Sequence, residues 1–89
     1  MQRRQIVFFG HVQGVGFRYT AVRAAGGYEV TGTVRNLHDG SVECVVEGEA
    51  AEIDSFLADL GEKMGRYIER STQTITAPTG QYASFGVDF

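Results

Sequence analysis

An apolar strand that runs into two closely spaced glycines and then a helix is the feature that most constrains this fold. The strand residues Ile6–Phe9 precede Gly14 and Gly16, and a helical pattern begins at Phe17. The first N–H groups of a helix have no partner inside the helix, and the helix dipole favours negative charge there. The glycines lack the Cβ atoms that would keep an anion from the backbone. Arg18 adds a planar guanidinium that matches phosphate oxygens, so the segment predicts an anion-binding loop.

Known phosphate loops fit this glycine segment poorly. A Walker A loop needs a lysine directly after its second glycine, and none stands here. A dinucleotide fingerprint needs a third glycine where this chain has Tyr19, and the chain is too short for a Rossmann sheet. An ordinary tight turn followed by a surface arginine remains an alternative. Against it, Arg18 lies in the first helical turn, where the dipole disfavours a cation unless an anion is bound.

Length and composition indicate one globular domain, residues 1–89. A chain of this size buries roughly 60 to 65% of its unfolded surface, enough for a core. The net charge of −3 gives no basic face for nucleic acid, and the longest apolar run is too short to span a membrane. The single cysteine, Cys44, can form neither an internal disulfide nor, alone, a metal site. Because the N-terminus has no signal-peptide pattern, we expect a cytoplasmic protein that binds neither nucleic acid nor membrane.

The order of the predicted elements is β-α-β-β-α-β, with one uncertain segment before the last strand. Alternating apolar residues indicate strands, a spacing of 3.6 indicates helices, and Asp39-Gly40 is a hairpin signal. The predicted strands are residues 3–11, 28–36, 41–48 and 85–89, the predicted helices are 17–26 and 49–65, segment 66–76 is a strand or an irregular extension, and 77–80 is a loop. This order predicts an α+β, ferredoxin-like sandwich, in which two helices pack on one face of a mixed antiparallel sheet.

Asn36 ends the second predicted strand on the same side as Val34, the side that we expect to face the helices. A polar amide there either forms the following turn or belongs to the anion site. In a β-α-β-β arrangement the first two strands can run close together, which would bring Asn36 to the glycine loop. An arginine with a carboxamide can bind a phosphoryl group and hold a water molecule. It supplies neither a strong base nor a nucleophile.

Two segments resemble the two signature motifs of the acylphosphatases. They are Phe9–Arg18 (FGHVQGVGFR) and Gly32–Val42 (GTVRNLHDGSV), and their separation also matches that family. The resemblance implies that Arg18 and Asn36 are catalytic, with Arg18 and the loop N–H groups binding the phosphoryl oxygens and Asn36 orienting the attacking water. It implies that the substrate-binding residues are His11, Val12, Gln13, Gly14, Val15, Gly16, Phe17 and Arg18.

The resemblance implies metal-independent hydrolysis of acyl phosphates to a carboxylate and inorganic phosphate. Phosphate would then be both product and competitive ligand, and we expect a monomer without cofactor or metal. An alternative is a non-hydrolytic phosphate- or carbamoyl-phosphate-binding module, as in similar domains of hydrogenase-maturation carbamoyltransferases. The length of 89 residues, with both Arg18 and Asn36 present, favours the free-standing enzyme. A non-catalytic interaction domain stays open as well, because a ferredoxin-like fold alone fixes no function.

Other polar and reactive residues have ordinary structural interpretations. Cys44 stands among valines and is expected to be a small core residue. The acidic residues from Glu47 to Asp54 are expected to form a solvated helix start. Tyr19 and Tyr28 are expected to pack on a helix and a strand, and His38 to be a solvated turn residue.

Overall fold

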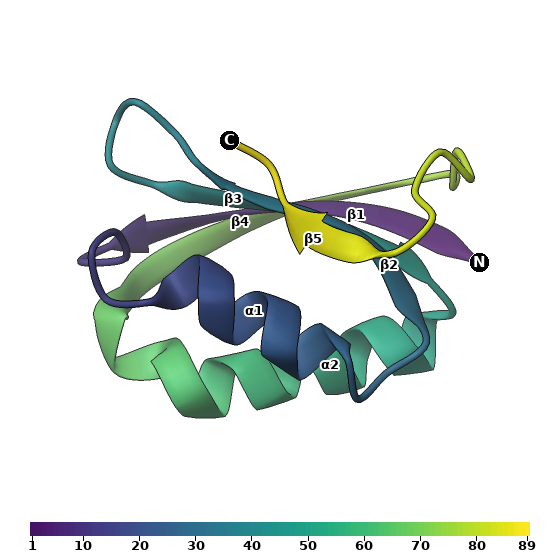
Figure 1. Cartoon of the computed structure of the whole chain (residues 1–89), viewed down its shortest axis with the longest axis horizontal. Helices are drawn as coiled ribbons and strands as arrows, with labels where there is room; N and C mark the ends of the chain where they lie inside the picture. The colour runs from purple at the N-terminus through teal and green to yellow at the C-terminus, as the bar shows by residue number, and fades with distance from the viewer.

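The computed structural model describes all residues, Met1–Phe89, as one five-stranded sheet with both helices on the same face (Figure 1). The strands are β1 (Gln2–Gly10), β2 (Val30–Asn36), β3 (Val42–Gly48), β4 (Ile68–Thr76) and β5 (Phe85–Val87). The helices are α1 (Phe17–Ala25) and α2 (Ala50–Met64), followed by the 3-10 turn η1 (Gly65–Tyr67). The predicted α+β, ferredoxin-like sandwich is confirmed, and each clearly predicted element lies within two residues of its expected bounds.

The strand order across the sheet is β4-β1-β3-β2-β5. Strand β1 pairs antiparallel with β3 and β4, β2 pairs antiparallel with β3, and the short β5 runs parallel to β2. The uncertain segment 66–76 is therefore mostly an edge strand, and the closing strand forms the opposite edge. Strand β3 lies between β1 and β2, so the first two strands of the chain are not adjacent in the sheet.

The hydrophobic core lies between the sheet and the two helices. Four residues at helical spacing on α2 are buried, namely Ile53, Phe56, Leu60 and Met64. Helix α1 buries Phe17 and three small residues, Ala21, Ala24 and Ala25, which allow it to approach the sheet closely. Cys44 on β3 is fully buried in this core, as expected. Each large apolar side chain buried there stabilises the fold by roughly 1.5 to 3 kcal/mol. Neither helix is long and apolar enough to cross a membrane.

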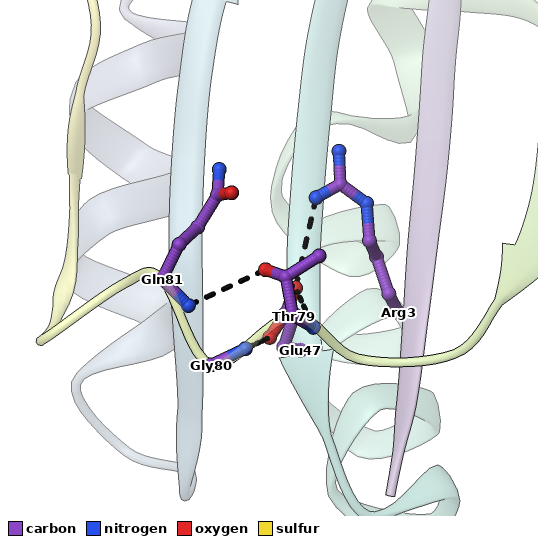
Figure 2. A network of polar contacts seen from close by, with 5 residues as sticks. All are labelled: Arg3, Glu47, Thr79, Gly80 and Gln81. Atoms are coloured by element: carbon purple, nitrogen blue, oxygen red, sulfur yellow. Dashed lines mark hydrogen bonds and ion pairs between the residues drawn. The ribbon is translucent and has the colours of Figure 1, made fainter.

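Residues 77–84 connect the two opposite edges of the sheet, and Glu47 on β3 holds this connection (Figure 2). The Glu47 carboxylate accepts hydrogen bonds from the Thr79 N–H at 3.0 Å, the Thr79 hydroxyl at 2.7 Å and the Gly80 N–H at 2.9 Å. A nitrogen of the Arg3 guanidinium lies 3.6 Å from the same carboxylate. We call these four residues the Glu47 network.

Glu47 is only 3% exposed, so the expectation that it is a solvated residue of a helix start is wrong. It precedes α2 on β3 and is buried beneath the 77–84 connection instead. Burial alone would raise the pKa of Glu47, but the hydrogen bonds from Thr79 and Gly80 and the charge of Arg3 outweigh burial and hold the pKa below its ordinary value.

Candidate active site

The loop between β1 and α1 takes a backbone shape that depends on its two glycines. Gly14 and Gly16 have φ angles of 78° and 79°, in the left-handed region that residues with a Cβ rarely adopt. Val12 is 1% exposed and anchors the loop in the core. Gly16 directly precedes α1, no side chain caps this helix end, and no acidic residue lies in its first turn. The positive end of the α1 dipole therefore faces out of the loop without an internal counter-charge.

The backbone donors of this loop are free. None of the N–H groups of residues 12–16 donates a hydrogen bond within the chain. Consecutive free N–H groups beside a helix N-terminus form a concave site for an anion. His11 differs, because its N–H donates to the Tyr67 carbonyl at 2.9 Å. Its N–H is therefore not available for the phosphoryl contact implied for the whole segment from His11 to Arg18.

A pocket of about 350 Å³ opens in front of the loop. Arg18 and Asn36 both line it, although they are 18 positions apart in the sequence and lie on different elements, Arg18 on α1 and Asn36 at the end of β2. Its walls are formed by Gly14, Gly16, Phe17, Arg18, Tyr19, Val22, Asn36, Val87 and Phe89. Of the predicted binding residues, four do not line the pocket, namely His11, Val12, Gln13 and Val15.

The two predicted catalytic side chains are unpaired in the chain. The Arg18 side chain makes neither a hydrogen bond nor an ion pair, and its guanidinium carbon lies 5.3 Å from the centroid of the Phe89 ring. Asn36 makes no side-chain hydrogen bond and is exposed, whereas Val34 on the same strand is fully buried. A guanidinium and a carboxamide are thus both free to bind a ligand in the same pocket.

Two features of the pocket were missed or misjudged in the sequence. Tyr19 is 66% exposed at the pocket wall, so the expectation that it packs on the helix is wrong. Val87 and Phe89 also line the pocket, because β5 pairs with β2 and brings the C-terminal segment beside Asn36. The apolar alternation at 85–89 predicts this strand but does not indicate with which strand it pairs.

The model of the family described as Acylphosphatase matches residues 4–87. The chain belongs to the acylphosphatase family. The acylphosphatase of Methylococcus capsulatus is 39% identical over 89 residues, which cover 98% of this chain and 96% of that protein. The acylphosphatase of Paenarthrobacter aurescens is 44% identical over 80 residues, covering 88% of this chain and 84% of that protein.

Solved structures show the same acylphosphatase fold. The crystal structure of acylphosphatase from Bacillus subtilis has a TM-score of 0.89 at 26% identity and covers both chains completely. The structure of T. kodakarensis HypF has a TM-score of 0.84 at 34% identity, but the match covers all of this chain and only 12% of HypF. The curated relatives, which match over most of their own length, carry the acylphosphatase name. These findings favour the acylphosphatase function over that of a module within a much longer chain.

Proposed function

We propose that this acylphosphatase-family chain hydrolyses the carboxyl-phosphate bond of small acyl phosphates, as a hydrolase of phosphorus-containing acid anhydrides. One observation supports this most directly: the unpaired Arg18 side chain, the unpaired Asn36 amide and the free loop N–H groups converge on one pocket. We also propose that the protein is a cytoplasmic monomer that needs neither a metal nor a cofactor. Inorganic phosphate, as product, is also a competitive ligand.

Arg18 and the N–H groups of the loop bind the phosphoryl oxygens. The Asn36 carboxamide holds a water molecule opposite the acyl oxygen, so that attack is in line with the bond that breaks. The water oxygen forms the new bond to phosphorus, the bond between phosphorus and the acyl oxygen breaks, and the carboxylate leaves with the electron pair. The proton of the attacking water passes to a phosphoryl oxygen.

This chemistry does not need a strong base on the protein. The leaving carboxylate is stable, and phosphoryl transfer has a loose transition state that is stabilised by positioning and by charge. The apolar side of the pocket, formed by Val22, Val87 and Phe89, lies beside the phosphoryl end and would contact the acyl group.

The test measures hydrolysis of acetyl phosphate and benzoyl phosphate with EDTA present, together with the Kd of inorganic phosphate. We expect Asn36→Ala to reduce turnover about 100- to 1000-fold, as for loss of one preorganised polar group, while phosphate binding is kept. Arg18→Ala should lose both turnover and phosphate binding. Arg23→Ala, on the same helix but outside the pocket, is the matched control. Near wild-type turnover of Asn36→Ala would contradict its role, and phosphate binding without any turnover by the wild type would support a binding module.

A further inference from the structure

The side chain of Gln13 connects the phosphate loop to the turn that follows Asn36. Its amide nitrogen donates to the Leu37 carbonyl at 2.8 Å and to the Ser41 carbonyl at 2.9 Å. Both amide hydrogens are therefore directed at the turn, and Gln13 is not part of the pocket wall. The contact joins segments that are 24 and 28 residues apart in the sequence.

The turn that Gln13 contacts is stiffened by its own hydrogen bonds. The Leu37 N–H donates to the Ser41 carbonyl at 2.9 Å, and the Gly40 N–H donates to the Leu37 carbonyl at 3.2 Å. The Asp39 carboxylate accepts from both the N–H and the hydroxyl of Ser41. Since Asn36 directly precedes this closed turn, whatever fixes the turn also fixes the position of Asn36.

We propose that Gln13 is a positioning residue that sets the separation between the loop N–H groups and the Asn36 amide. Strands β1 and β2 are not neighbours, so no backbone ladder joins the two halves of the site directly. Gln13 supplies a direct side-chain link between them. As a catalytic role this inference rests on the proposed function, because Gln13 acts on turnover through Asn36.

The replacement Gln13→Met keeps the length of the side chain and its neutral charge but removes both donors. The Leu37 and Ser41 carbonyls each retain a partner within the turn, so we expect the variant to fold. A displacement of about 1 Å at a reacting group can reduce turnover on the order of 100-fold. We expect kcat on acetyl phosphate to fall about 10- to 100-fold, with the Kd of inorganic phosphate changed less than about threefold. Gln81→Met is the control, because the Gln81 side-chain amide makes no hydrogen bond.

A double-mutant cycle distinguishes positioning from a general loss of structure. In an Asn36→Ala background, Gln13→Met should cause no further loss of kcat, because the group it positions is already gone. Losses that multiply in full, or a weakening of phosphate binding equal to the loss of kcat, would overturn the proposal.

A second measurement does not depend on activity. On titration with inorganic phosphate, amide NMR shifts of the wild type should change in the loop and also at Leu37 to Ser41. In Gln13→Met the changes in the turn should disappear while those in the loop remain. If the turn responds equally in both proteins, the proposed link is wrong. A wild type that does not hydrolyse acyl phosphates but shows the coupled shifts would contradict the proposed function and leave the link supported.

Discussion

Replacing Glu47 by glutamine tests how the chain holds its C-terminal segment beside the pocket. One oxygen of Glu47 accepts both donors of Thr79, and the other accepts the Gly80 N–H (Figure 2). A glutamine retains a single acceptor oxygen and places an NH₂ donor at the second position. In either orientation at least one donor of the 77–84 connection faces another donor, and Arg3 loses its counter-charge.

The expected cost follows from these contacts. A hydrogen bond to a charged group contributes about 1.5 to 3 kcal/mol, and the buried position of Glu47 leaves little room for water to replace it. We therefore expect Glu47→Gln to lower the free energy of unfolding by about 2 kcal/mol. For a domain of this size that corresponds to a fall in Tm of roughly 10 °C. Urea unfolding and thermal melting measure both quantities.

Glu43→Gln is the matched control, because Glu43 lies on the same strand and accepts from Gln5 and Arg35 at the surface. Exposed pairs of this kind contribute about 0 to 1 kcal/mol. Equal losses for the two variants, or a loss below about 0.5 kcal/mol for Glu47→Gln, would refute the argument that buried charge-assisted bonds hold the connection.

The pH dependence gives a second readout for Glu47. Its pKa in the folded chain lies below the ordinary value of 4.5, so the unfolded chain binds a proton at Glu47 more readily than the folded chain does. The stabilisation is complete above that ordinary value and is lost as the pH falls through the lowered folded pKa. In Glu47→Gln this part of the acid dependence should be absent, so wild type and variant should converge in stability on acidification. A stability difference that stays constant down to low pH would contradict the assignment.

Two further predictions concern the loop and the core. Gly16→Ala forces an alanine to φ 79°, at a cost of about 1 to 2 kcal/mol, and should weaken inorganic phosphate binding about tenfold in a calorimetric titration. The control Gly61→Ala lies inside α2 with open space around the added Cβ, so it should raise stability instead. Unchanged phosphate binding by Gly16→Ala would contradict the loop argument. Burial, with a smaller effect of the Glu43 charge, raises the pKa of Cys44 to about 12. A thiol reagent at pH near 8 should therefore label Cys44 only after the chain is unfolded in urea. Rapid labelling of the native chain would contradict the place of Cys44 in the core.

The parts of the fold that sequence reasoning predicted are those in which neighbouring residues carry the signal. The apolar strand, glycine loop and helix N-terminus follow one another without a break, and Asp39-Gly40 marks the hairpin. Strand β4 was uncertain because eight of its nine residues are exposed, so its sequence has no buried face to reveal it. The chain alone also did not show that its last two strands lie at opposite edges of the sheet.

The sequence predicted which residues form the site but not how the elements of the fold bring them together. Arg18 and Asn36 line one pocket as the two motifs implied, yet β3 lies between β1, which precedes the loop and Arg18, and β2, which ends at Asn36. Glu47 was misjudged because its hydrogen-bond partners, Thr79 and Gly80, lie 32 and 33 residues away in the sequence. The charges near Glu47 in the sequence predict a solvated carboxylate, because the segment that covers it is distant in the sequence.

The antiparallel strands give the site stiffness, but β3 lies between β1 and β2, so no ladder joins its two halves directly. The loop after β1 and the end of β2 are related through β3, on which Val42 pairs with both Phe8 and Asn36. The Gln13 amide adds a direct connection between them on one side of the pocket. On the other side, β5 pairs with β2 and carries Val87 and Phe89 to the wall, while the Glu47 network fixes the connection that leads to it. Polar contacts outside the pocket thus hold segments that lead to its walls. Substitutions that leave every pocket residue intact should then still change turnover, by moving Asn36 or the apolar wall relative to the loop.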